Sequence, residues 1–442
     1  MTDAPTADAP RKSFLLATFE GGGSVPPFVE LARRLVARGH RVRLMSDACN
    51  RPEALAADAR FVPWTTAPSK IGRGRAFDYF QDWAAPTPFE GILAACRAVF
   101  TGPALAFAGD VMNELAREPA DLVVANELLF GVHLGCEAAA QNTVLLGVNI
   151  NLFPAAGALP MGPGLMPARS ADEAAAHEAM RTAIREALDA ATLPGFNAAR
   201  IALGLAPLAS LADQHKATRG LLLATSRAFD FAPEPMPDGL RYVGPLLGDP
   251  GWAAPFASPF ARDDRRPLVL VAFGTTFQNH AGAVQRVMEA LGPLPIRGVV
   301  TLGGALVRSD LGTIPDNVAV VESAPHGALM REAAVVVTHG GHGTVMKALA
   351  NACPMLVMPH GRDQADNAAR IAARGAGLPL AAGASVAEIR AALVRLLEEP
   401  AFTTAAVDLG RKVQAEAEAS PLLSLLEAMA ATPPRSGTLC AA

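Results

Sequence analysis

Short runs of consecutive apolar residues alternate along the chain with segments in which apolar residues recur at helical spacing. In the first part, strand-like runs occupy residues 14–19, 41–45, 122–124 and 144–148, and a helical pattern covers residues 28–38. Unbroken apolar runs are typical of parallel strands whose two faces are both covered by helices. We therefore predict a doubly wound α/β domain.

The same alternation returns after a segment rich in proline and glycine. Residues 231–267 hold several turn-forming pairs and predict a linker. Beyond it, the pattern predicts further strands and helices at residues 268–273, 281–291, 298–302, 318–321, 334–338, 343–351 and 355–358. Two doubly wound domains joined in this way face each other across a cleft, and ligands of such sheets bind outside the carboxyl ends of the strands.

A long insertion separates the two series. Residues 154–167 hold several glycines and prolines and predict a loop. Ser170 and Glu173 form a capping-box pattern, which predicts the start of an alanine-rich helix that runs to about residue 191. We expect this helix to be a lid-like insertion. Residues 2–10 can bury little apolar surface, so we expect a loose tail there.

Composition narrows the class of protein. The 442 residues suggest two or three domains, and a share of 51% hydrophobic and 18% charged residues excludes wholesale disorder. A net charge of -4 gives no broad cationic field, so we expect no nucleic-acid partner. The five scattered cysteines lack CxxC spacing, which argues against a disulfide framework or a structural zinc site and favours a reducing compartment.

The hydropathy pattern does not favour membrane insertion. The apolar run 14–19 ends at Glu20 and a glycine run, so it predicts a buried strand rather than a signal peptide. The longest candidate, 122–153, is interrupted by Glu127 and Glu137 and stays short of the roughly 18 to 20 uncharged residues that span a bilayer. We expect a cytoplasmic protein without stable membrane insertion.

The most informative segment is Thr-His-Gly-Gly-His-Gly-Thr at 338–344, between a predicted strand and a predicted helix. Glycines let backbone N–H groups approach an anion closely, and a helix N-terminus adds about half a positive charge. The segment therefore fits a diphosphate. A tight turn with surface histidines is the alternative.

A second polar segment follows the apolar run 355–358. Within residues 359–367, Asp363 and Gln364 can accept and donate hydrogen bonds to vicinal hydroxyls, as a sugar requires. Taken alone, the pair is equally compatible with a helix N-cap beside a solvated neighbour.

Together the two segments, with Cys353-Pro354 between them, resemble the donor-binding region of inverting glycosyltransferases that use nucleotide sugars. The resemblance covers nearly the whole chain. It includes Pro27 with the residues that follow it at 31–32 and 38–40, and also 274–276 and 325–326. Bacterial macrolide, polyketide and glycolipid glycosyltransferases are the nearest relatives by these motifs.

The resemblance implies a GT-B fold, in which residues 1–245 bind the acceptor, residues 246–405 bind the donor and residues 406–442 form helices that return to the first domain. It implies further that Asp363 and Gln364 hold the sugar hydroxyls. The remaining implied donor contacts are Thr275, Thr276, His326, His339, Gly341, His342, Gly343 and Thr344.

Two departures leave the base of the donor open between uridine and thymidine. Family members often stack an aromatic residue on the base near position 323, where this chain offers no ring except His326. Plant relatives place a Glu for the ribose where this chain has Lys347.

The implied chemistry is a single displacement that inverts the anomeric carbon and releases a nucleoside diphosphate. We expect a helix N-terminus and His339 to supply positive charge for the leaving group. Because the chain has no Asp-x-Asp motif, we predict metal-independent transfer with the UDP- or dTDP-sugar as co-substrate and no further cofactor.

The acceptor base is the weak point of the resemblance. Where family members usually have a His and an Asp, this chain has Ser24 and Asn126, and neither is a general base near neutral pH. Burial could raise the pKa of Glu20 or Glu127 toward neutrality, and we favour Glu20. A solvated or backbone-capping carboxylate is the alternative for each, and an acidic phenol or carboxylic acid acceptor would need little base.

Aromatic residues and methionines cluster in the first half and predict a greasy acceptor pocket, although ordinary core is the alternative. The principal candidates are Phe80, Trp83, Phe130 and Phe153, within a wider set of Phe77, Tyr79, Phe89, Met161 and Met166. We expect His133, on the helix after the fourth strand, to be a core histidine.

The favoured function is thus transfer of a sugar to a hydroxyl or similar nucleophile of a hydrophobic small molecule by a monomer or homodimer. A catalytically silent homologue that serves as an auxiliary or binding protein is the second hypothesis, and a sugar-nucleotide epimerase is the third. Nicotinamide binding is disfavoured because the glycines at 21–23 lack Gly-x-Gly-x-x-Gly spacing. Acceptor, sugar, linkage and oligomeric state stay open.

Overall fold

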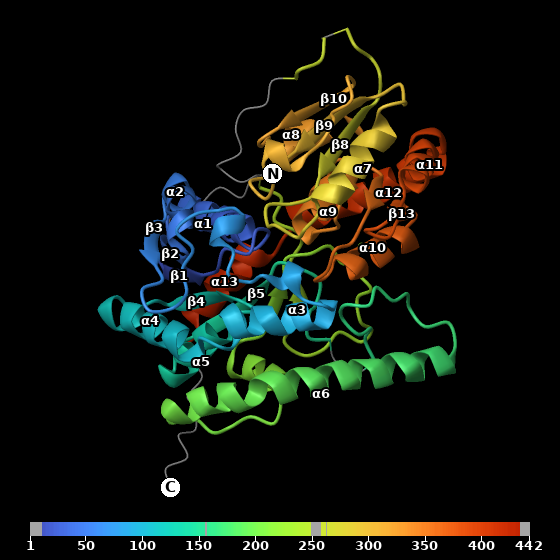
Figure 1. The fold of residues 1–442 in the computed structure, drawn as a ribbon. Coiled ribbons are helices and arrows are strands. Elements are labelled where there is room, and N and C mark those ends of the chain that lie inside the picture. Colours follow the sequence, from blue (N-terminus) through green and yellow to red (C-terminus); the bar gives the residue numbers. More distant parts are fainter. Residues whose placement is uncertain (1–10, 155–156, 249–257, 262, 434–442) are drawn as a thin grey trace.

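The computed structural model describes residues 11–154, 157–248, 258–261 and 263–433. These residues form two parallel α/β domains that face each other (Figure 1). The prediction of a two-domain, doubly wound α/β fold is therefore confirmed. The expected N-terminal tail and the central part of the expected linker lie outside the described residues.

The first domain is built on a seven-stranded sheet in the order β3-β2-β1-β4-β5-β6-β7. All its strand pairs are parallel; Leu15, for example, lies between Arg43 and Val123. The strands are β1 (Ser13–Ala17), β2 (Arg41–Ser46), β3 (Arg60–Pro63), β4 (Leu122–Asn126), β5 (Thr143–Gly147), β6 (Leu221–Leu223) and β7 (Leu240–Tyr242).

Helices cover both faces of this sheet: α1 (Val25–Ala37), α2 (Arg51–Ala56), α3 (Pro88–Ala95), α4 (Ala104–Arg117) and α5 (Phe130–Ala138). Helix α5 crosses α4 at close range because two glycines of α5, Gly131 and Gly135, face α4. A Cβ at Gly131 would lie 2.6 Å from the carbonyl oxygen of Ala104, so no larger residue fits there. This contact holds the end of β4 and its following loop at the cleft.

The second domain has a six-stranded sheet in the order β10-β9-β8-β11-β12-β13. Its strands are β8 (Leu268–Ala272), β9 (Arg297–Thr301), β10 (Val318–Val321), β11 (Ala333–Thr338), β12 (Met355–Val357) and β13 (Gly377–Pro379). Its helices are α7 (Ala281–Leu291), α8 (His326–Met330), α9 (His342–Ala350), α10 (Gln364–Ala373) and α11 (Val386–Glu398).

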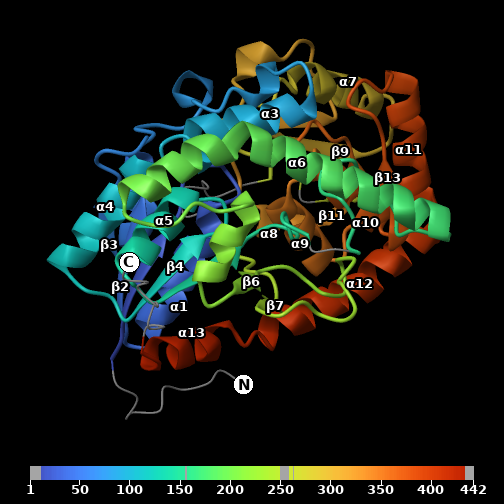
Figure 2. The same cartoon turned by 90° about the horizontal axis from the view of Figure 1, so that it is seen from below.

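The C-terminal helices tie the two domains together. Helix α12 (Pro400–Glu418) packs on α9 of the second domain, so the predicted boundary at 406 falls inside a helix. Helix α13 (Leu422–Ala431) then lies on the first domain, where Leu422 and Leu426 join the core beneath the first sheet (Figure 2). Glu427 of α13 also pairs with Arg38 and His40.

Helix α6 (Ala171–Ala202) is longer than predicted. It begins at the expected capping box, where the Glu173 N–H donates to Ser170 Oγ at 3.1 Å. The expected end near residue 191 was wrong, because the helix continues through Pro194 to Ala202. Its last turns are stabilised by burial of Phe196 against α4 and α5, which outweighs the lost hydrogen bond at the proline. Figure 2 shows α6 running beneath both domains.

One described helical stretch, Pro88–Arg117, is long and apolar enough to cross a membrane by length and composition, and the sequence-based expectation of 122–153 as the longest candidate overlooked it. The stretch comprises α3, a π-turn at Cys96–Phe100 and α4. Its apolar residues pack on α5 or line the cavity described below.

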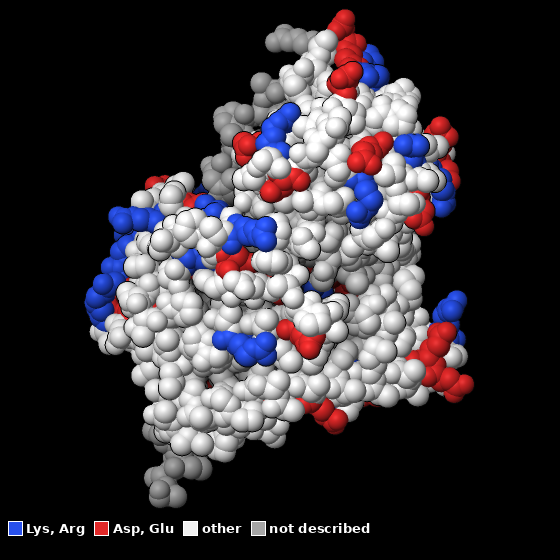
Figure 3. All heavy atoms as spheres, viewed as in Figure 1, with Lys and Arg blue, Asp and Glu red and all other residues white. Residues whose placement is uncertain are grey.

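The surface fits the modest net charge. On the face in Figure 3, acidic and basic side chains are interspersed and wide uncharged areas separate them. The described cysteines, Cys49, Cys96, Cys136 and Cys353, are free thiols.

The packing of α13 predicts that the last helix stabilises the first domain. We expect Leu426→Ala to lower the free energy of unfolding by about 2–5 kcal/mol, because it opens a cavity in a closed core. Ser424→Ala, on the exposed side of the same helix, is the matched control and should change it by less than about 0.5 kcal/mol. Equal denaturant midpoints for both variants would contradict this role of α13.

Candidate active site between the two domains

A cavity of about 490 Å³ lies between the two domains. Its wall contains every predicted donor contact, namely Thr275, Thr276, His326, His339, Gly341, His342, Gly343, Thr344, Asp363 and Gln364. It also contains the predicted acceptor residues Phe80, Trp83, Phe130 and Phe153. Of the candidate bases, Glu20 and Ser24 line the cavity and Glu127 does not.

The donor wall is centred on the loop between β11 and α9. Helix α9 begins at His342 with Gly341 as its N-cap, so its first N–H groups have no partner within the helix. Gly340 takes a left-handed backbone (φ 94°). A Cβ at Gly341 would lie 2.7 Å from His339 Nε2, so the loop packs directly on that ring. The result is an open helix N-terminus, which is a suitable seat for a diphosphate.

The surroundings of His339 disfavour its protonated form. Burial lowers its pKa well below the ordinary value, and the neighbouring His280, His360 and Arg362 lower it further. This shift opposes a positive charge on His339, and the expectation that it supplies charge to the leaving group stays a prediction. Its imidazole can contribute a hydrogen bond, while positive potential comes from the helix N-terminus and from Lys347 in the same wall.

His342 faces the other domain. Its Nε2 lies 2.7 Å from Thr225 Oγ1, just after β6 of the first sheet. Burial lowers the pKa of His342 to about 4, so the imidazole is neutral at physiological pH. It was predicted as a donor contact, but this hydrogen bond commits its side chain to joining the N-terminus of α9 to the first domain.

The predicted sugar-binding pair stands at the start of α10. Gln364 is buried, and its amide is engaged at both ends: Oε1 accepts from the His360 N–H and Nε2 donates to Gln278 Oε1, each at 2.7 Å. Asp363 accepts from Asn367 Nδ2 at 2.9 Å and keeps its place in the cavity wall. Burial raises the pKa of Asp363. Asp363 is therefore the more available of the two for a hydroxyl.

The loop after β8 brings Thr275 and Thr276 against the first domain. A Cβ at Gly22 would lie 2.7 Å from Thr275 Oγ1, and Gly22 has a positive φ of 77°, so this crossing requires glycine. Thr276 Oγ1 accepts from Arg362 Nη1 at 3.1 Å. On the same wall, His326 Nε2 lies 3.3 Å from Thr301 Oγ1.

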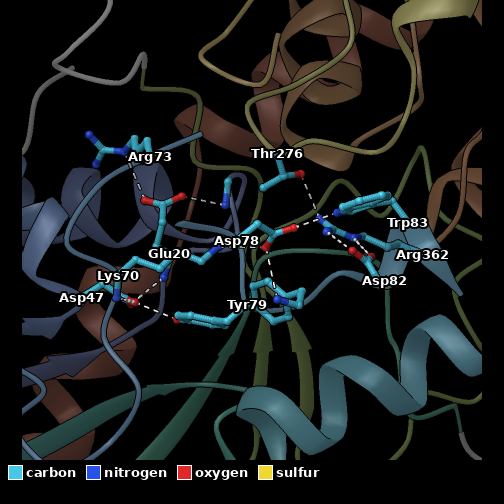
Figure 4. Close-up of polar contacts among 12 residues, drawn as sticks. Glu20, Asp47, Lys70, Arg73, Asp78, Tyr79, Asp82, Trp83, Thr276 and Arg362 are labelled. Atoms are coloured by element: carbon cyan, nitrogen blue, oxygen red, sulfur yellow. Dashed lines mark hydrogen bonds and ion pairs between the residues drawn. The ribbon is translucent and has the colours of Figure 1, made fainter. Parts of the chain in front are cut away.

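Glu20 lies in the loop after β1, with its carboxylate in the cavity wall (Figure 4). Its Oε1 accepts from the Gly22 N–H at 2.9 Å, and its Oε2 lies 3.3 Å from Arg73 Nε. Burial raises the pKa of Glu20, although Arg73 opposes the shift. The Glu20 carboxylate thus accepts a backbone hydrogen bond, as expected for the alternative of a backbone-capping carboxylate, and it also faces the cavity.

Ser24 and Asn126 have mainly local partners. Ser24 is the N-cap residue of α1, and its carbonyl oxygen accepts from Thr18 Oγ1 at 3.3 Å. Asn126 Oδ1 accepts from the Leu128 N–H at 3.0 Å. His133 is buried, bonds through Nε2 to the Asn126 carbonyl at 2.9 Å and has a pKa lowered to about 3 by burial. The expectation of a core histidine is confirmed.

Glu127 lies behind the cavity, at the end of β4. It is fully buried, and its two carboxylate oxygens would each lie 3.0 Å from a Cβ at Gly147. Burial raises its pKa to about 8; the Asn149 side chain opposes this shift and Asp363 adds to it. Glu127 is therefore mostly protonated at neutral pH and is out of reach of a molecule in the cavity.

The acceptor wall is largely aromatic and aliphatic. Phe80 packs edge-on with Phe19 at 5.9 Å between ring centroids, and Phe130 packs edge-on with Phe153 at 5.5 Å. Trp83 stands apart, because its ring packs on Phe277 of the second domain. From the wider predicted set, Met161 lines the cavity, whereas Phe77, Tyr79, Phe89 and Met166 do not. Further unpredicted apolar lining comes from α3 and α6 and includes Ile92, Ile184 and Leu188.

Several polar residues of the cavity wall were not predicted from the sequence. Arg73, Asp82, Asn149 and Arg362 line the cavity from four separate segments. Arg362 was within the segment 359–367 but has no motif role, and the other three have no spacing signal at all. Their positions depend on partners far away in the chain.

The chain is similar in sequence and in fold to several known proteins. Residues 285–429 match a family model described as erythromycin biosynthesis protein CIII-like, C-terminal domain. The chain is 29% identical to 4'-demethylrebeccamycin synthase of Lentzea aerocolonigenes over 94% of this chain and 99% of that protein. Its fold is similar to that of the kitacinnamycin glycotransferase, with a TM-score of 0.73 and 21% identity over 95% of this chain and 99% of that one. It is also similar to the glycosyltransferase VinC in complex with dTDP, with a TM-score of 0.66 and 20% identity over 94% of this chain and 99% of that one.

The burial of Glu127 predicts a pH dependence of stability. Below about pH 4.5 the Glu127 carboxyl is neutral in both the folded and the unfolded state. Between that pH and about 8 only the unfolded chain releases the proton. This group therefore makes the free energy of unfolding of the wild type fall as pH rises. Glu127→Gln removes this contribution. We expect the variant to gain a few kcal/mol on the wild type between pH 5 and pH 8, as measured by denaturant midpoints. Glu332→Gln, at an exposed position, is the control and should track the wild type.

Proposed function

Because this chain belongs to the GT-B glycosyltransferases of the natural-product family, we propose that it transfers a hexose from a UDP- or dTDP-sugar to a hydroxyl or similar nucleophile of a hydrophobic natural product, without a metal ion. One observation carries the proposal. A single cavity has an open helix N-terminus with Asp363 on one wall and an aromatic, aliphatic surface on the other.

The donor fits the second domain. The diphosphate would accept hydrogen bonds from the first N–H groups of α9 and from neutral His339. Asp363 would then lie beside the sugar hydroxyls. Release of the nucleoside diphosphate develops negative charge at this helix N-terminus, which supports transfer without a cation. The dTDP complex of VinC concerns a protein of similar fold and leaves uridine and thymidine both open for this chain.

The acceptor fits the first domain. Phe80, Phe130 and Phe153 would cover an apolar aglycone. The relatives 4'-demethylrebeccamycin synthase and aklavinone 7-beta-L-rhodosaminyltransferase are named for natural products. The nucleophile would approach the anomeric carbon from the side of the loop that holds Glu20. A carboxylate with a raised pKa can accept the proton of a hydroxyl as the new bond forms.

One observation favours a second candidate. Ser24 and Asn126 replace the usual base and its partner. The Ser24 carbonyl oxygen accepts from Thr18 Oγ1, and Asn126 Oδ1 accepts from the Leu128 N–H. A silent homologue would bind the nucleotide without turnover. Binding and transfer therefore have to be measured on the same preparation.

The donor proposal predicts base-selective binding of UDP or dTDP over GDP by calorimetry, and transfer from the matching sugar nucleotide to a hydrophobic phenol or alcohol. His339→Ala should weaken diphosphate binding at least about tenfold, because a hydrogen bond to a charged group is lost. Transfer in the presence of a chelator should equal transfer without it. Binding without transfer would favour the silent homologue, and the absence of binding would contradict the donor site.

The base proposal predicts a kinetic effect of Glu20→Gln. We expect kcat to fall by about 10²–10⁴-fold while binding of the nucleoside diphosphate is unchanged, because only proton transfer is lost. Glu53→Gln is the matched comparison, since Glu53 is the other carboxylate that pairs with Arg73, at 2.5 Å. If both variants lose activity equally, the effect is structural and Glu20 is not the base.

A further inference from the structure

A charged contact joins the two domains directly beside the proposed sugar site. Arg362 donates through Nε and Nη2 to the two carboxylate oxygens of Asp82, at 2.6 and 3.0 Å. Asp82 belongs to the first domain and Arg362 to the second, so the pair bridges the cleft (Figure 4). Two parallel N–H···O bonds are the most directional form of this interaction.

The Arg362 backbone is arranged for this contact. Its φ is 56°, a left-handed conformation that few residues other than glycine hold without outside restraint. The third nitrogen, Nη1, donates to Thr276 Oγ1, and the guanidinium lies 5.9 Å from the Phe80 ring centroid. The side chain is thus held from several directions, and the residue that follows it is Asp363.

Asp82 is itself held by a rigid part of the first domain. The neighbouring Trp83 donates through Nε1 to Asp78 at 3.2 Å, and Asp78 also pairs with Lys70 at 3.4 Å. The Lys70 N–H donates to Asp47, which accepts from the Glu20 N–H through its other oxygen. A series of polar contacts therefore connects the loop of Glu20 to Trp83, the residue that follows Asp82.

The same segment touches the second domain a second time. Trp83 packs edge-on against Phe277 at 5.0 Å, and the Arg75 guanidinium lies over both rings at 5.0 and 4.4 Å. A Cβ at Gly74 would lie 3.2 Å from the Gly304 carbonyl oxygen. Residues 74–83 thus form an arm of the first domain that rests on the second.

We propose that Arg362, through its pair with Asp82, is a positioning residue that holds Asp363 at the donor sugar only when the arm of the first domain is docked. The proposal rests on the proposed function, in which Asp363 binds the sugar. The pair makes competence of the sugar site depend on docking of the arm, whereas the N-terminus of α9 meets the first domain separately, through His342, and does not depend on this pair.

The test compares Asp82→Asn, Arg362→Lys and the reversed pair Asp82→Arg/Arg362→Asp in the full chain. Asp at position 362 suits a left-handed backbone, so the reversed pair is compatible with the loop. We expect Asp82→Asn to lower kcat/KM for the nucleotide sugar about tenfold or more and to leave the Kd of the nucleoside diphosphate within about twofold. Arg362→Lys should be intermediate, and the reversed pair should recover most of the loss.

Asp264→Asn is the matched control, because it neutralises an aspartate of an exposed ion pair with Arg266, remote from the cavity wall. It should behave as the wild type. Hydrogen exchange supplies a readout that does not need transfer: Asp82→Asn should speed exchange in both 74–84 and 360–366, because each segment restrains the other.

The outcomes are distinguishable. Unchanged kcat/KM in Asp82→Asn, an equal loss of nucleoside diphosphate affinity, or a reversed pair as impaired as the single variants would each overturn the positioning role. If the wild type transfers no sugar, the proposed function fails. Faster hydrogen exchange in both segments of Asp82→Asn would still show that the Asp82–Arg362 pair restrains the two segments.

Discussion

The open N-terminus of α9 is the constraint around which the cleft is arranged. Its first N–H groups lack partners in the helix and must face solvent or an anion. The glycines at 340–341 allow the chain to turn there over the ring of His339, and His342 joins the helix to Thr225 of the first domain. Strands β8 and β12, the neighbours of β11 in the sheet, present the flanking loops on either side. The second domain thus directs the N-terminus of α9 toward the cavity between the two domains.

Low polarity in the cleft decides which groups can carry charge. Burial lowers the pKa values of His339, His342 and His360 and raises those of Glu20 and Asp363. The permanent charges of Arg73 and Arg362 are matched by carboxylates. An incoming diphosphate is therefore the main uncompensated charge, in surroundings where fixed dipoles act strongly.

Local patterns predicted the fold well because buried parallel strands and glycine-rich turns leave signals in adjacent residues. The strands at 268–272 and 333–338 and the turn before α9 are of this kind. The chain did not reveal how far α6 extends, because packing of Phe196 overrides the proline. It also concealed the partners of His342 and Arg362, since each bonds to a residue more than a hundred positions away. The raised pKa values of Glu20 and Glu127 were anticipated from the sequence, whereas the lowered pKa of His339 depends on burial and neighbours that only the fold brings together.

The return of α13 to the first domain has a consequence for biosynthesis. The ribosome makes the first domain early, yet Leu422, Leu426 and Ala430 complete its core. Until those residues leave the exit tunnel, the apolar surface that they cover stays exposed to the cell, while the second domain has already been synthesised. The domain that is made first is therefore completed only after the second domain has been made.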